Sequence, residues 1–106
     1  MFEPTFQKYA KQPCGGCQIH VTDRRAFRPV RTAVELIAEF RREAPDQFAW
    51  REPPYEYEHD KMPIDILYGS EALRAAVAAG RVADLVRGWE RDEESFRRQR
   101  ESFLLY

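Results

Sequence analysis

The stretch from Cys14 to Pro29 constrains the fold most, because it joins a glycine pair, an alternating segment and a helix start. The two glycines that follow Cys14 permit backbone angles that are closed to other residues. From Cys17 to Thr22 apolar and polar side chains alternate, which is typical of a half-buried strand. Pro29 suits the first turn of a helix. The stretch therefore predicts a strand, a short link and a helix.

The helix is predicted over 29–43, where apolar residues recur three and four positions apart and Pro45-Asp46 follows. Ile37 and Phe40 are expected to be buried on its inner face. Upstream, residues 1–13 are expected to form an irregular N-terminal arm whose aromatic side chains dock on a neighbouring element.

Residues 48–50 are predicted to form a short strand or an extended segment, and a further strand is predicted at 55–59, with Pro53-Pro54 favouring an edge position. A helical turn is expected over 63–67, with Ile64 and Leu67 facing inward.

Ser70 is a suitable N-cap for a helix over 72–79, and Gly80 is a natural stop. Another helix begins near Val82. A separate last helix, about 92–102, is expected to touch the body through Trp89, Phe96 and Phe103, which lie seven residues apart.

These elements predict a single compact α+β domain over residues 1–106, with a small β-sheet packed against three or four helices. A chain of 106 residues suffices for one modest core. The formal net charge of −1 argues against nucleic-acid binding. No apolar run is long enough to span a membrane, and no signal peptide is expected after Met1.

The charge is nevertheless uneven along the chain. Residues 1–32 carry six Lys or Arg against two acidic residues, whereas residues 44–65 carry two against six. If these regions face different ways, the basic one is suited to an anionic ligand or partner. Ordinary surface charge is the alternative.

The candidate binding site lies where the first predicted strand ends, since ligands of open α/β sheets sit beyond the carboxyl ends of strands. Its residues are His20, Thr22, Asp23, Arg24 and Arg25. Charged groups in so short a link cannot be buried unpaired, so we expect them together at one surface, lining a groove.

Three interpretations of this cluster stay open. His20 and Asp23 suit a general acid and base. Alternatively, His20 is a hydrogen-bonded structural residue and Asp23 caps a turn. Thr22 and Asp23, together with the two arginines, also suit a sugar carboxylate or a peptide.

Cys14, Cys17, His20 and Asp23 recur every third residue, and all three residue types bind zinc. In a strand, however, Cys17 and His20 point to opposite faces, and the chain has no second cysteine pair. We therefore predict no metal and no cofactor. The cysteine pair has redox spacing, but it precedes a strand rather than a helix, which favours a structural disulfide or two buried thiols.

An acidic run invites comparison with the paired carboxylates of glycosidases. Its members are Glu56, Glu58, Asp60 and Asp65. A solvated strand face is the alternative, and no convincing carboxylate pair stands out. Likewise, the aromatic residues Trp50, Tyr55 and Tyr57 suit either sugar stacking or packing.

The chain resembles the C-terminal part of the exo-β-N-acetylmuramidase family, once described only as a domain of unknown function. The resemblance runs through the sequences Pro-Thr-Phe-Gln-Lys-Tyr-Ala from residue 4, Cys-Gly-Gly from 14, Gln-Ile-His-Val-Thr-Asp from 18, Phe-Arg-Pro-Val from 27, Phe-Ala-Trp from 48, Asp-Ile-Leu from 65 and Phe-Leu-Leu-Tyr from 103. The Cys-Gly-Gly and His-Val-Thr-Asp blocks are its most specific parts. Cys17 departs from the family pattern, where an aliphatic residue is usual.

The resemblance implies a Rossmann-like N-terminal catalytic domain as partner, absent from this chain, and an extracytoplasmic location. It further implies hydrolysis of terminal N-acetylmuramic acid from peptidoglycan, with this chain forming one wall of the cleft and not catalysing alone. Muramic acid carries a lactyl carboxylate, so arginines near the cleft make chemical sense. The alternative function is a stand-alone, non-catalytic module that binds a protein or a glycan.

Overall fold

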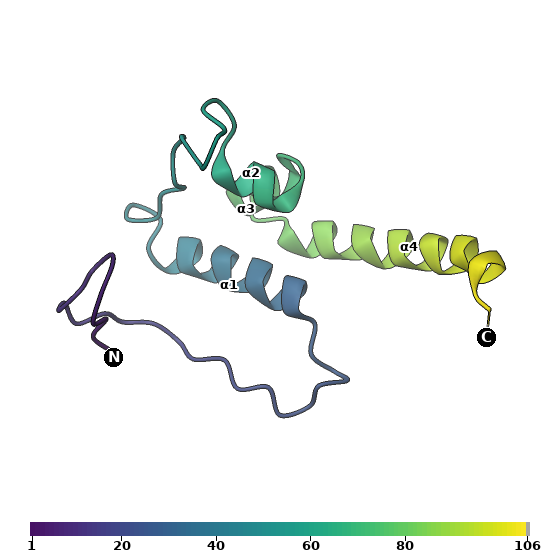
Figure 1. The fold of residues 1–106 in the computed structure, drawn as a ribbon, viewed down its shortest axis with the longest axis horizontal. Helices are drawn as coiled ribbons and strands as arrows, with labels where there is room; N and C mark the ends of the chain where they lie inside the picture. Colours follow the sequence, from purple (N-terminus) through teal and green to yellow (C-terminus); the bar gives the residue numbers. More distant parts are fainter. Residues whose placement is uncertain (106) are drawn as a thin grey trace.

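Four α-helices and a short 3-10 helix make up the regular structure of the computed structural model, which describes residues 1–105 (Figure 1). They are α1 (Pro29–Glu43), α2 (Pro63–Tyr68), α3 (Ala72–Ala79), α4 (Val82–Arg100) and η1 (Glu101–Phe103). Helices α1, α3 and α4 contact one another, and α2 lies against α3. No helix within residues 1–105 is long and apolar enough to cross a membrane.

Helix α1 has the predicted bounds, with Pro29 in its first turn. Val34 is buried, and Ile37 packs against the core as predicted. Phe40, in contrast, is 51% exposed, so its predicted burial is wrong. Among the helices within residues 1–105, α3 and α4 pack against α1, and they leave the Phe40 ring half uncovered.

Helices α2 and α3 also match their predicted positions, because local signals set their ends. Gly69 and Gly80 follow the two helices in left-handed conformations, with φ of 90° and 67°, which glycine adopts without steric cost. The Ser70 hydroxyl accepts the N–H of Ala72 at 3.4 Å. Leu67 points outward, contrary to expectation, and Tyr68 packs on the core instead.

Helix α4 runs unbroken through Gly88, so the prediction of a separate last helix is wrong. One glycine costs a helix only about 1 kcal/mol, which long-range packing of the first half of α4 offsets. Trp89 supplies part of that packing, since its indole N–H donates to the Tyr68 hydroxyl at 2.9 Å. Beyond this point α4 projects from the body (Figure 1), and Phe96 and Phe103 are exposed rather than docked.

The hydrophobic core is small and lies where α1, α3 and α4 meet. Its buried members are Val34, Leu73, Val77, Val82 and Val86. Trp50 packs against this core from an irregular segment and meets Phe48 edge to face, with ring centroids 5.0 Å apart.

The predicted α+β fold with a small β-sheet is wrong for residues 1–105. Two isolated antiparallel bridges, Phe2–Cys14 and Tyr55–Glu58, are the only β-pairing there. Residues 17–22 are extended but exposed, and the 48–50 and 55–59 segments are not strands. Alternation marks residues suited to a strand, but a strand also needs a neighbouring backbone, and nothing in this part of the chain supplies one.

Residues 1–13 contain turns and bends but no helix, and the predicted docking of their aromatic side chains is not observed. Phe2 and Cys14 exchange backbone hydrogen bonds of 3.0 and 2.7 Å, which close the arm into a loop. Phe6 and Tyr9 remain exposed on it.

The molecule is extended for its length. Its radius of gyration is 17.5 Å, against about 13 Å for a compact domain of this size. Its accessible surface is 9486 Å², against about 6,200 Å² for a compact protein of similar mass. Much apolar surface therefore lies uncovered.

Candidate functional site

A shallow depression of about 450 Å³ lies beside the N-terminal half of α1. His20, Thr22 and Asp23 line one side, and α1 lines the other with Arg31 and Glu35. The structure therefore brings three of the five predicted site residues together.

Asp23 organises a turn just before α1. Its Oδ1 accepts the backbone N–H groups of Arg25 at 2.8 Å and Ala26 at 3.3 Å. The N–H of Phe27 also donates to the Asp23 carbonyl at 3.1 Å. An aspartate that bonds the backbone two residues on is a common way to fix a turn. The turn-capping interpretation thus accounts for one carboxylate oxygen, while Oδ2 makes no hydrogen bond within residues 1–105.

Arg24 and Arg25 do not line the depression. They directly follow Asp23, which does line it. Both are exposed, and neither forms an ion pair with residues 1–105. Arg28 instead donates to the Arg25 carbonyl at 2.8 Å, which stiffens the link into α1. Arg24 and Arg25 thus present guanidinium groups that are available to an anion.

On the α1 side, charges are already paired. Arg31 donates to Glu35 at 2.8 Å, and this hydrogen bond raises the pKa of Arg31. His20 is exposed on the opposite side, and no hydrogen bond joins it to Asp23 within the described residues. Within the described residues, the histidine and aspartate of the depression are therefore not assembled as an acid–base pair.

Three members of the acidic run, Glu58, Asp60 and Asp65, line a second depression of about 600 Å³. Glu58 Oε1 accepts the N–H groups of Asp60 at 2.9 Å and Lys61 at 3.3 Å, and these bonds lower the pKa of Glu58. Asp65, which is largely buried, accepts a two-pronged hydrogen bond from Arg74, with distances of 3.1 and 2.7 Å. Both carboxylates thus serve the structure of the chain.

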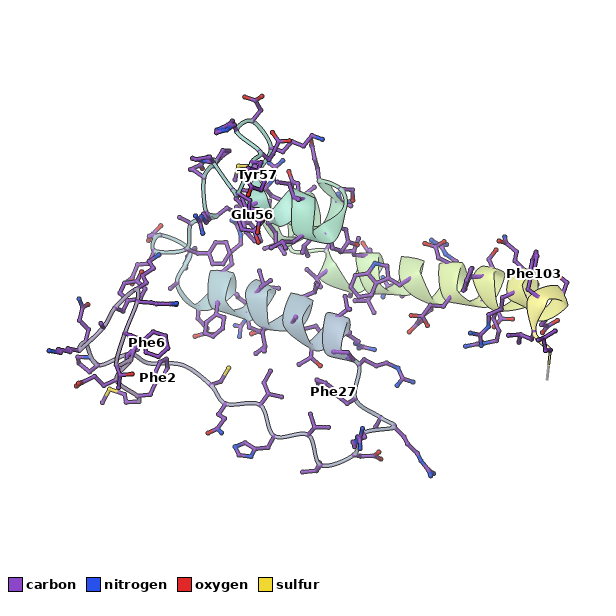
Figure 2. All side chains as sticks on the ribbon, viewed as in Figure 1. Phe2, Phe6, Phe27, Glu56, Tyr57 and Phe103 are labelled. Carbon is purple, nitrogen blue, oxygen red and sulfur yellow. The ribbon has the colours of Figure 1, made fainter. Side chains whose placement is uncertain are left out.

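The aromatic residues near this run do not gather into a sugar platform. Trp50 packs on the core, the Arg51 guanidinium lies 5.7 Å from the ring centroid of Tyr55, and Tyr57 is 97% exposed. In the view of Figure 2, Tyr57 and Glu56 lie near the start of α2 and away from α1.

Both cysteines are free thiols, and Cys17 is exposed. The structure therefore contains neither the disulfide nor the two buried thiols that the sequence favoured. Among residues 1–105, no three histidine, cysteine, aspartate or glutamate side chains gather into a group that could hold a metal ion.

Sequence reasoning missed a groove of about 710 Å³ between α1 and α4. Val77, Val82 and Val86 form its floor, and charged side chains surround it. The charged residues are Arg31, Glu35, Glu39, Arg41, Arg42, Arg87 and Glu90. The groove forms only when α1 and α4 pack together, so no local sequence pattern marks it.

Comparisons with known proteins agree with the resemblance seen in the sequence. The family model described as "Exo-beta-N-acetylmuramidase NamZ, C-terminal" matches residues 1–106. The peptidoglycan beta-N-acetylmuramidase NamZ of Bacillus subtilis (strain 168) is 27% identical over 106 residues. The match covers 99% of this chain and 24% of that relative, so the chain spans about a quarter of the relative's length. No solved structure matches.

The family match extends over the whole sequence and includes the Asp23 turn, α1 and the α1–α4 groove. The chain belongs to the family of the C-terminal domain of the exo-β-N-acetylmuramidase NamZ.

Proposed function

We propose that this chain forms one wall of the substrate cleft in a peptidoglycan exo-β-N-acetylmuramidase-like hydrolase and helps bind the terminal N-acetylmuramic acid. The observation that carries the proposal is the match of residues 1–106 to the C-terminal domain of that family. The catalytic carboxylates then belong to an N-terminal partner domain. This division is consistent with Glu58 and Asp65, whose carboxylates are engaged by hydrogen bonds within the chain.

The large uncovered surface supports a domain that works against a partner. The chain exposes roughly 3,000 Å² more than a compact protein of its mass. Apolar side chains such as Ile19, Phe96 and Leu104 contribute to this surface.

The ligand chemistry of the Asp23 turn suits a muramic acid residue. Its lactyl carboxylate is an anion that an arginine binds through two parallel N–H donors, and Arg24 and Arg25 carry such donors. The Thr22 hydroxyl and the free Oδ2 of Asp23 are suited to sugar hydroxyls. The depression beside α1, which Thr22 and Asp23 line, supports the proposal because it offers room for a sugar ring beside these two side chains.

The test uses a chimera in which this chain replaces the matched C-terminal quarter of the Bacillus subtilis relative. We expect the chimera to release a chromogenic aglycone from an N-acetylmuramide. The isolated chain and the N-terminal part alone should not release it above a heat-killed control. Turnover by the isolated chain that is lost on mutating one of its acidic residues would overturn the division of roles.

A second set of variants tests the site itself. In the chimera, Asp23→Ala should lower activity about tenfold or more, which corresponds to about 1.4 kcal/mol. Asp23→Asn keeps an oxygen for the turn but removes the charge, so it separates capping from sugar binding. Asp46→Ala removes an exposed aspartate that makes no hydrogen bond within residues 1–105, and it should leave activity unchanged. Full activity of Asp23→Asn at matched thermal stability would reduce Asp23 to a turn residue.

The alternative, an independent binding module, predicts a different result. The isolated chain would then bind peptidoglycan fragments on its own, and the chimera would gain no activity from it. Equilibrium binding to a muramic acid-terminated fragment distinguishes the two functions.

A further inference from the structure

Residues 15–22 form an extended segment that runs alone below α1, between the Phe2–Cys14 bridge and the Asp23 turn (Figure 2). Every residue in it is exposed. We call it the 15–22 segment. The Phe2 ring lies against Gly16 at one end, and residues 20–22 face α1 across the depression at the other.

The backbone of the 15–22 segment makes no hydrogen bond with residues 1–105. The segment contains no proline, so each of its eight residues offers one N–H donor and one carbonyl acceptor. None of the eight has a positive φ, so all are compatible with β-pairing. A row of unpaired donors and acceptors in extended backbone is a template for pairing with another strand.

The side chains of the 15–22 segment place a requirement on its partner in addition to the backbone hydrogen bonds. Ile19 and Val21 share one face and are 52% and 44% exposed, whereas Gln18, His20 and Thr22 share the other face. Branched side chains suit a pleated surface with one apolar face. A partner must therefore offer both a strand edge and an apolar layer beneath it.

We propose that the 15–22 segment docks as an added edge strand on a β-sheet of the catalytic partner domain, with Ile19 and Val21 packed beneath that sheet. Strand addition of this kind gains affinity from main-chain hydrogen bonds and specificity from alternate side chains. The inference rests on the proposed function for the identity of the occupant. The Bacillus subtilis relative is about four times as long as the match, which leaves ample chain to supply such a sheet.

A second copy of this chain is the competing occupant, and charge repulsion disfavours only its parallel pairing. Parallel pairing in register would set Arg24 and Arg25 against their own copies, with mutual repulsion. Antiparallel pairing centred on His20 would set them opposite Gly16 and Gly15, which carry no charge. The partner-domain assignment also has a functional consequence, because it brings the Asp23 turn to the rim of the catalytic domain.

Residue-resolved hydrogen exchange on the isolated chain and on the chimera tests the proposal. In the chimera, every second amide of the 15–22 segment should exchange about a hundredfold more slowly than in the isolated chain. The pattern alternates because an edge strand pairs through one side only. Proline replacements at two neighbouring positions, Cys17→Pro and Gln18→Pro, leave Ile19 and Val21 in place and should differ, since only one of the two removes a paired N–H. The harmful variant should abolish protection of the whole segment.

Several outcomes would overturn the proposal. An active chimera with an unprotected 15–22 segment would leave the proposed function standing and reject the strand. Equal effects of the two proline variants would reject one-sided pairing. Protection already present in a dimeric isolated chain would assign the segment to a second copy instead. Conversely, a protected segment in an inactive chimera would support the strand and count against the proposed function.

Discussion

Truncating Leu73 should cost a large share of the stability of this chain. Leu73 is 3% exposed and belongs to a core of five buried side chains. Leu73→Ala removes about three methylene equivalents, worth about 2.4 kcal/mol at about 0.8 each. The cavity left behind raises the expected loss in unfolding free energy to about 3 kcal/mol, with a range of about 2–5. Domains of this size are stable by only about 5–15 kcal/mol.

Leu67→Ala is the matched control for this change. The substitution is chemically identical and lies in the neighbouring helix α2, but Leu67 is 68% exposed. We expect a change within about 0.5 kcal/mol, the usual range for surface substitutions. The comparison therefore isolates burial from the intrinsic effect of replacing leucine by alanine.

Urea unfolding followed by far-ultraviolet circular dichroism measures both variants. Leu73→Ala should lower the midpoint without changing the slope, because the slope reports the surface exposed on unfolding. A loss under about 1 kcal/mol for Leu73→Ala, or an equal loss for Leu67→Ala, would refute the assignment of the core to the α1–α3–α4 junction.

Three further predictions follow from particular contacts. Phe40→Ala should cost under about 1 kcal/mol in the same urea assay, because half of the ring is exposed; a loss of several kcal/mol would mean that the ring is buried. Tyr68→Phe removes the acceptor for Trp89 and should cost about 1 kcal/mol, whereas the exposed Tyr57→Phe should cost nothing; equal melting temperatures for both variants would contradict that hydrogen bond. Hydrogen bonds from the N–H groups of Asp60 and Lys61 lower the pKa of Glu58 below its ordinary value of 4.5, so they stabilise the fold above that pH and lose this contribution as pH falls below it. Melting temperatures are measured from about pH 6 to about pH 3, which spans that ordinary pKa. As pH falls, they should drop less steeply for Glu58→Gln than for the wild type. Parallel curves would contradict a stabilising role for these two hydrogen bonds.

The candidate site was partly visible in the sequence because its main contact is local. Asp23 bonds to backbone groups two and three residues on, and that turn follows from residue type and from the nearby helix start at Pro29. The depression beside α1 and the α1–α4 groove were not visible, because each needs two separated segments at a defined distance. The acidic run illustrates the same limit, since Asp65 is matched by Arg74 only once α2 and α3 pack together.

Local chemistry in the sequence determined the family and most helix ends. Pro29 and Gly80 act within a turn of their own position, which is why α1 and α3 have the predicted bounds. Tertiary structure decided which faces are covered and whether extended segments are paired. Phe40 stays half exposed because the elements that pack on α1 do not cover its ring. The 15–22 segment forms no sheet because a strand needs a second backbone that residues 1–105 do not provide. Periodicity predicts which side of each element is apolar. Only the packing of elements that are distant in the sequence decides whether that side is buried.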